Sequence, residues 1–190
     1  ANIANLTNYL DQIELIDKPI HDCKNLEEIF LDNNLIIDCM GWTAHHEAIE
    51  KPEQDIYCNV LSHLQVIKAL RNSSGKQIIY LGSRGQYGNI NTDIIYENMP
   101  MLPEDVQGIN KVSAENFYRV YSKFYDFDVL SLRIPNCFGP GQLTKGDIGL
   151  VGSFIKDSFS GKQIEVYGKD RKRSLLFARD LAEIIFILTG

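Results

Sequence analysis

The sequence predicts an α/β fold, in which helices cover both faces of a doubly wound parallel sheet. Short apolar runs alternate along the chain with longer segments whose apolar residues recur at helical spacing. The apolar runs show little alternation with polar residues, which is typical of strands buried on both faces of a parallel sheet. The chain has 190 residues, enough for one domain with a substantial core.

The first predicted elements follow a short apolar run at residues 13–16. Asn25 is a residue type that caps helices, and a helical apolar pattern comes directly after it. We therefore expect a helix that contains Leu26, Ile29 and Phe30. Residues 35–40 are almost continuously apolar, so they predict a strand that is buried on both faces.

The rest of the chain repeats this alternation. Apolar residues at helical spacing predict long helices over residues 56–71 and 112–125. Buried strands are predicted over 77–81 and 129–132, and a further helix is expected around 153–159. Strands and helices of these lengths connect by right-handed crossovers, so the predicted strands lie parallel in one sheet.

Composition and charge disfavour several kinds of partner. The formal net charge of −6 argues against a surface for nucleic acid or an anionic membrane. The longest apolar stretches, such as 181–188, are too short to span a membrane, and the first residues show no signal-peptide pattern. No Cys-x-x-Cys pair occurs, so we expect a cytoplasmic protein with isolated, buried, reduced thiols. The cysteines are Cys23, Cys39, Cys58 and Cys137.

Small, polar and proline residues gather where three predicted strands end, at residues 38–41, 82–88 and 134–141. In open parallel sheets, ligands bind beyond the carboxyl ends of the strands, so we expect a ligand site there. Residues 82–88 are rich in glycine, but their spacing differs from the Gly-x-Gly-x-x-Gly turn of dinucleotide sites. The sequence therefore contains no recognisable turn for binding the dinucleotide phosphates.

Other kinds of site are disfavoured. His45 and His46 are adjacent and point in different directions, and no cysteine stands at ligand spacing, so we expect no metal site. The residues around Ser83 do not supply the Gly-x-Ser-x-Gly turn of serine hydrolases. The basic cluster at 169–173 is too short for a nucleic-acid tract and suits a local phosphate contact.

Four segments resemble the NAD-dependent epimerase/dehydratase family, whose members are extended short-chain dehydrogenases that act on nucleotide sugars. The segments are 77–87, 97–100, 108–115 and 132–141, and they occur in the family's order. The resemblance implies a Rossmann-like fold, NAD or NADP as cofactor, and a nucleotide-sugar substrate. It also implies that the chain lacks the family's first strand–helix–strand unit. Residues 1–145 would then be a partial dinucleotide-binding domain, and 146–190 the start of a smaller substrate-binding region.

The resemblance implies three catalytic positions. Ser83 matches the serine or threonine that hydrogen-bonds the reacting sugar hydroxyl, the alternative being a serine that satisfies the backbone of a turn. Lys111 matches the lysine that holds the nicotinamide ribose, the alternative being a solvated helix lysine. Gln107 stands four residues before Lys111, where the family carries the tyrosine that transfers a proton. A glutamine amide does not titrate, so this is the main departure from the family.

The substitution at Gln107 leaves three interpretations open. Another group could act as the base, with Tyr87 and Asp105 as candidates. The site could bind a nucleotide sugar or dinucleotide without catalysis, as a regulatory protein would. The motif could also be displaced, although no tyrosine lies between Tyr96 and Tyr118 to replace it.

The resemblance also implies binding residues and an assembly. Gly41, Asn59 and Pro135 would lie beside the cofactor, and Asn136 and Arg173 would contact the substrate. Core, turn or solvated positions are the alternatives for these residues. In the family the two long helices, here 56–71 and 112–125, pair across a dimer axis, so we expect a homodimer.

Overall fold

The computed structural model describes residues 3–142, 149–166 and 172–190 of the chain. Its main sheet has three parallel strands in the order β1-β2-β3: β1 (Leu35–Asp38), β2 (Lys76–Ser83) and β3 (Phe127–Ile134). All three strands were predicted, but β2 and β3 extend beyond the predicted ranges because their ends pair along the full register from Lys76↔Phe127 to Ser83↔Ile134. The parallel α/β fold is therefore confirmed.

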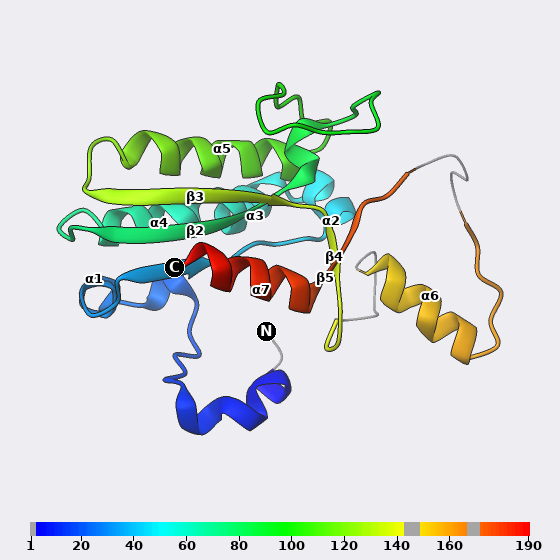
Figure 1. Cartoon of the computed structure of the whole chain (residues 1–190), viewed down its shortest axis with the longest axis horizontal. Helices are drawn as coiled ribbons and strands as arrows, with labels where there is room; N and C mark the ends of the chain where they lie inside the picture. The colour runs from blue at the N-terminus through cyan, green and yellow to red at the C-terminus, as the bar shows by residue number, and fades with distance from the viewer. Residues whose placement is uncertain (1–2, 143–148, 167–171) are drawn as a thin grey trace.

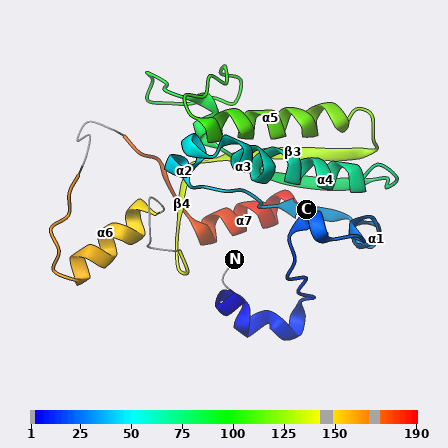
Figure 2. The same cartoon turned by 180° about the vertical axis from the view of Figure 1, so that it is seen from behind.

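Helices lie on both faces of this sheet (Figures 1 and 2). One face carries a continuous helical run and a second long helix. The run comprises α3 (Pro52–Ile56), the π-helical turn η3 (Tyr57–Leu61) and α4 (Ser62–Ala69). The second helix is α5 (Val106–Tyr121), and α7 (Ala178–Leu188) lies on the opposite face.

The core lies between the sheet and the helices α4 and α5. Its apolar side chains come from both helices and from two strands, which explains the helical spacing seen in the sequence. The buried cluster consists of Val66, Ile67, Leu70, Ile78, Tyr80, Ala114, Tyr118 and Phe127. Burial of this set fixes how α4 and α5 sit over the sheet and thereby positions everything at the strand ends.

The strand β1 departs from the prediction. It lies at the edge of the sheet, and Ile37 is 44% exposed although the sequence predicted burial on both faces. Among the residues that the structure describes, no strand pairs with the outer edge of β1. The apolar sequence of a central strand thus occupies an edge position in this chain.

The residues before β1 form short helical segments. These are η1 (Ile3–Gln12), η2 (Ile20–Asp22) and α1 (Leu26–Leu31). The helix after Asn25 was predicted correctly, but the Asn25 side chain makes no capping hydrogen bond. The apolar run at 13–16 forms no strand, and Ile13 and Ile16 are exposed.

A second, two-stranded sheet follows the first. β4 (Asn136–Phe138) pairs in parallel with β5 (Leu175–Phe177), and α6 (Leu150–Phe159) projects away from the main sheet (Figure 1). α6 was predicted over a slightly shorter range. Cys39 is exposed and the other three cysteines are half-buried, so the expectation of buried thiols was wrong, although all four are free. The helix α2 (His45–Glu50) completes the set of described elements.

No helix in residues 3–142, 149–166 and 172–190 is long and apolar enough to cross a membrane.

Candidate functional site

A cleft of about 800 Å³ opens where the strands of the main sheet end. Its walls come from the segment after β1, the end of β2, the start of α5, and the second sheet with α6. It collects seven of the eight residues that the sequence nominated for catalysis or binding. These are Gly41, Ser83, Gln107, Lys111, Pro135, Asn136 and Arg173.

Lys111 reaches from α5 to the ends of two neighbouring strands. Its Nζ donates to the carbonyl oxygens of Met40 at 3.1 Å and Leu81 at 3.3 Å, and it lies 5.1 Å from the centroid of the Tyr80 ring. Gly41 permits this approach, because a Cβ there would lie 3.0 Å from Nζ. Lys111 is therefore fixed in the structure and is not the solvated helix lysine considered as an alternative.

The charge of Lys111 depends on buried carboxylates. Burial lowers the pKa of the Lys111 ammonium, while the negative charges of Asp38 and Asp55 oppose that effect. Neither carboxylate forms an ion pair with Lys111 within the part of the chain that the structure describes. The stabilisation therefore acts through space and not through a direct salt bridge.

Asp38 is held by three donors at the end of β1. His63 Nδ1 lies 2.5 Å from its Oδ2, the Tyr118 hydroxyl donates to the same oxygen at 2.6 Å, and the Met40 amide donates to Oδ1 at 2.9 Å. Burial acts to raise the pKa of Asp38, but these hydrogen bonds and the His63 charge outweigh it and lower the pKa. Asp38 is thus a buried carboxylate that also orients the Met40 peptide, whose carbonyl accepts from Lys111.

Ser83 ends β2 and begins the short 3₁₀ turn η4 (Arg84–Tyr87). Its Oγ accepts from the Gly85 amide at 3.0 Å, and its own amide donates to Oε1 of Gln86 at 2.7 Å. This reciprocal pair is a capping box, so the turn role considered from sequence is present. The same hydroxyl lines the cleft, which leaves it placed to donate toward a ligand.

Gln107 is 7% exposed and connects α5 to the segment after β1. Its Nε2 donates to the Trp42 carbonyl at 2.8 Å. Asn59 holds the same peptide from the other side, since its Oδ1 accepts from the Trp42 amide at 2.8 Å and its Nδ2 donates to the Trp42 carbonyl at 2.9 Å. The glutamine amide therefore helps to fix one wall of the cleft.

Asn59 is the nominated residue that does not line the cleft. It is fully buried in η3, where Nδ2 also donates to Asp55 at 2.6 Å. Asn110 donates to the other oxygen of Asp55 at 2.6 Å, so this carboxylate links η3 to α5. Asn59 supports the strand-end segment from behind.

The two groups considered as replacement bases occupy different surroundings. Tyr87 is 5% exposed, and its hydroxyl accepts from Nη1 of Arg133 at 2.6 Å. Asp105 lines the cleft as the N-cap of α5, where Oδ1 accepts from the Gly108 amide at 2.6 Å. Its Oδ2 lies 3.4 Å from Nδ1 of His45, which also lines the cleft.

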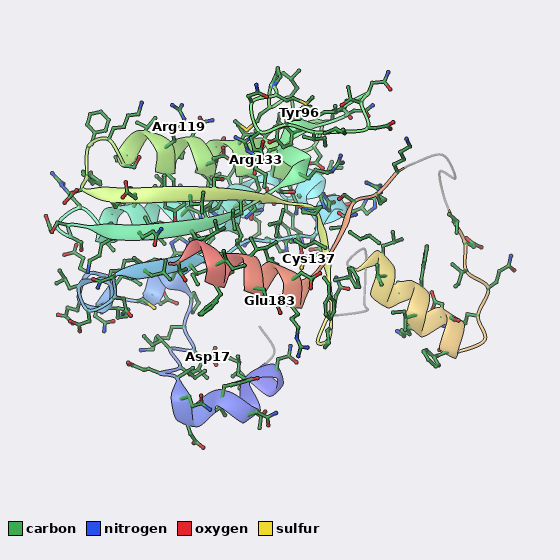
Figure 3. All side chains as sticks on the ribbon, in the orientation of Figure 1. Asp17, Tyr96, Arg119, Arg133, Cys137 and Glu183 are labelled. Atoms are coloured by element: carbon green, nitrogen blue, oxygen red, sulfur yellow. The ribbon has the colours of Figure 1, made fainter. Side chains whose placement is uncertain are left out.

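A network that the sequence analysis missed supports the Ser83 turn. Glu115 on α5 accepts from Gln86 at 2.6 Å, from Ser131 at 2.8 Å and from Nε of Arg133 at 3.0 Å. Arg133 also donates to the Glu97 carbonyl at 2.9 Å, which ties the loop that carries Tyr96 to β3 (Figure 3). The available signal was a pair of opposite charges on a predicted helix and a predicted buried strand, Glu115 and Arg133.

A further wall of the cleft is built from the second sheet. Asn136 begins β4 and is exposed, with Pro135 half-buried beside it. Arg173 lies just before β5 and is also exposed. Lys169 and Arg171 of the basic cluster lie outside the described residues. In the described ranges no group of three or more His, Cys, Asp and Glu residues could hold a metal ion.

The chain matches one protein family. The family described as NAD dependent epimerase/dehydratase matches residues 2–189. The dTDP-4-dehydro-6-deoxyglucose reductase of Escherichia coli is 29% identical over 164 residues, which are 84% of this chain and 52% of that protein.

Solved structures show the same fold. A UDP-N-acetylglucosamine 4-epimerase from Methanobrevibacter ruminantium, in complex with UDP-N-acetylmuramic acid, superposes with a TM-score of 0.89 at 22% identity, covering 96% of this chain and 59% of that one. A UDP-glucuronic acid 4-epimerase from Bacillus cereus, in complex with UDP-glucuronic acid and NAD, gives 0.88 at 18% identity, covering 99% and 60%. The chain thus spans 52% to 60% of the length of these relatives.

Proposed function

Because the chain belongs to the NAD-dependent epimerase/dehydratase family, we propose that it acts as a nucleotide-sugar epimerase or dehydratase through transient oxidation of a sugar hydroxyl. The observation that carries the proposal is the position of Lys111. Its ammonium is fixed between the Met40 and Leu81 carbonyls in a cleft that Ser83 and Asn136 also line. A fixed cation beside a hydroxyl and an amide suits a ligand that is rich in hydroxyl groups.

The cleft suits the nicotinamide end of NAD, with NADP as the alternative that the sequence left open. Gly41 and Pro135 line it beside Lys111, and Gly41, which has no side chain, lets a ring approach the backbone there. Lys111 would hold the ribose, and Asn59 would support that wall from behind. When bound, the dinucleotide accepts and returns a hydride.

The substrate proposal rests on the opposite wall. Ser83 would hydrogen-bond the reacting hydroxyl, Asn136 would contact the sugar, and Arg173 would bind the diphosphate, for which a guanidinium is well suited. We propose residues 1–145 as the cofactor-binding part and 146–190 as the start of the substrate-binding part. A homodimer and a cytoplasmic location belong to the same proposal.

A second function is favoured by one observation. Gln107 occupies the family's tyrosine position, and its amide donates to the Trp42 carbonyl. The Gln107 amide does not titrate, and its hydrogen bond holds one wall of the cleft. These properties suit a protein that binds a nucleotide sugar or dinucleotide without transforming it. A non-catalytic binding protein is therefore the alternative to the enzyme, and the experiment has to distinguish the two.

The test uses protein expressed from its complete reading frame. Calorimetry with NAD and with UDP-glucose measures binding, and turnover is assayed with UDP-glucose and UDP-N-acetylglucosamine. We expect Lys111→Met to weaken NAD binding, whereas Lys68→Met, at an exposed position on α4, leaves it unchanged. Equal NAD affinity in both variants would exclude the proposed cofactor site.

Two further variants separate the enzyme from the binding protein. Ser83→Ala should abolish turnover, while Ser83→Thr keeps a hydroxyl and should retain it. Activity that appears only in Gln107→Tyr supports the non-catalytic alternative, because the unmodified chain would then lack its proton-transferring group.

A further inference from the structure

The chain carries an imidazole–carboxylate pair on the wall of the cleft. His45 begins α2, and its Nδ1 lies 3.4 Å from Oδ2 of Asp105 at the N-terminus of α5. The two side chains are 57% and 48% exposed, so both reach the solvent of the cleft. They line it together with Ser83, Gln107 and Lys111.

Three other titratable groups near the site, Tyr87, Asp38 and Lys111, are engaged in supporting contacts. Burial raises the pKa of the Cys39 and Cys137 thiols, which also line the cleft. The Tyr87 hydroxyl is buried and accepts from Arg133, and Asp38 is 3% exposed behind the wall. Lys111 is held by two carbonyl oxygens, which leaves its charge for binding. Gln107 cannot exchange a proton at any ordinary pH. His45 is therefore the cleft-lining residue whose chemistry best suits proton transfer near neutral pH.

We propose that His45, oriented by Asp105, is the acid–base residue that exchanges a proton with the sugar hydroxyl. The proposal rests on the proposed function, and it names the group that takes over from the residue at position 107. Asp105 is the positioning residue, because its Oδ2 lies 3.4 Å from Nδ1 of His45 and leaves the other ring nitrogen for proton exchange.

In the proposed step the hydroxyl O–H bond would break and give its proton to the imidazole of His45. The C–H bond of the same carbon would break, a C=O bond would form, and the oxidised nicotinamide would supply the acceptor for the hydride. In the return step the imidazolium would give the proton back to the oxygen as the carbon regains its hydride. Ser83 hydrogen-bonds the same oxygen throughout, since a hydroxyl both donates and accepts.

Asp105 is suited to this role by its own surroundings. The hydrogen bond with His45 and that from the Gly108 amide lower the pKa of Asp105, while burial opposes them. It is thus a carboxylate when the imidazole becomes charged, and opposite charges at this distance attract. Gln107, being neutral, adds no charge between His45 and Lys111.

The adjacent histidine provides a matched control. His46 has the same chemistry and the same helix, but it does not line the cleft. With NAD and UDP-glucose as probes, we expect His45→Gln to lower kcat by roughly 10²–10⁴-fold. KM and the calorimetric affinity for UDP-glucose should stay unchanged, and His46→Gln should leave kcat unchanged.

Rescue separates a proton-transfer role from a packing role. Free imidazole should restore part of the turnover of His45→Gly in proportion to its concentration, and it should not affect His46→Gly. Asp105→Asn keeps a good N-cap but removes the carboxylate. We expect it to lower kcat less than His45→Gln does, with the helical circular dichroism unchanged.

A readout independent of turnover is the imidazole NMR spectrum. Addition of UDP-glucose should shift the ring signals of His45 and leave those of His46 in place. Full turnover in His45→Gln, or no response of His45 to bound UDP-glucose, overturns this inference and leaves the proposed function standing. Failure of the unmodified protein to bind UDP-glucose or NAD overturns both.

Discussion

At the scale of single residues, Lys111 is a cation held by two carbonyl oxygens, with no carboxylate in ion-pair contact among the residues that the structure describes. Burial lowers the pKa of this ammonium, and the charges of Asp38 and Asp55 raise it. Asp38 has a second role, because it accepts from the Met40 amide and the Met40 carbonyl accepts a hydrogen bond from Lys111. Tyr118 and His63 hold Asp38 in place. The other ring nitrogen of His63, Nε2, is buried and has no hydrogen-bond partner among the described residues.

The first prediction concerns this indirect pair. Asp38→Asn keeps the size of the side chain and removes its charge, so the pKa of Lys111 should fall further below its ordinary value of 10.5. NMR titration of the lysine ε-carbons measures this directly. Lys76, which donates to the Leu31 carbonyl at the other end of β2, is the internal reference and should not change. An unchanged Lys111 titration would show that Asp38 serves packing alone.

At the scale of elements, the Glu115–Arg133 pair joins α5, β3 and the turn after β2. Each partner is largely buried, with side-chain exposures of 9% and 18%. The start of α5 also packs closely on that turn, since a Cβ at Gly108 would lie 2.9 Å from the Gly85 carbonyl oxygen. The geometry of Ser83 therefore depends on contacts from three separate elements.

The second prediction follows from the acid–base behaviour of Glu115. Burial acts to raise its pKa, but the bonds from Arg133, Gln86 and Ser131 outweigh this and lower the pKa from 4.5. A depressed pKa in the folded state adds stability that is present above pH 4.5 and is lost as the pH falls through the folded-state value. Glu115→Gln should cost about 3 kcal/mol at neutral pH.

Urea unfolding at neutral and acidic pH measures both effects. The unmodified protein should lose stability toward acid more steeply than Glu115→Gln does. Asp128→Asn, which alters an exposed carboxylate on the same strand, should change the free energy of unfolding by less than about 0.5 kcal/mol. The same acid dependence in Glu115→Gln as in the unmodified protein would contradict the assignment.

At the scale of the whole molecule, apolar side chains remain exposed on two neighbouring helical segments. Ile56 and Leu61 on the first are 42% and 40% exposed, and Ile109 and Val120 on α5 are 53% and 39% exposed. Apolar surface in this arrangement is typical of an interface between subunits. It agrees with the proposed homodimer that the resemblance implies, in which these two helical segments would form the interface.

The third prediction tests that assembly. Sedimentation should give twice the mass of one chain, and Ile109→Asp should shift the protein to monomer because it places a charge in the buried interface. Ile94→Asp, at a 60% exposed position in the loop between β2 and α5, should leave the dimer intact. A monomer at all concentrations of the unmodified protein would rule the interface out.

The sequence by itself determined the α/β class and the three parallel strands, and it placed Ser83 and Asn136 at strand ends. These features follow from local patterns, because apolar periodicity defines strands and helices and glycine and proline mark their ends. Four of the nominated residues lie in the predicted strand-end segments and meet at the cleft, since parallel strands place their carboxyl ends at one edge; they are Gly41, Ser83, Pro135 and Asn136.

Only the tertiary structure decided which of these residues face the cleft and which support it. Asp38 and His63, Gln107 and Trp42, and Asp105 and His45 are pairs whose members lie on different elements. Their meeting depends on how α4 packs against β1 and how α5 packs against the segment after β1, which no local pattern encodes. The exposure of Ile37 on the edge strand could not be predicted either. Burial of a strand depends on neighbouring elements that the sequence of the strand does not specify.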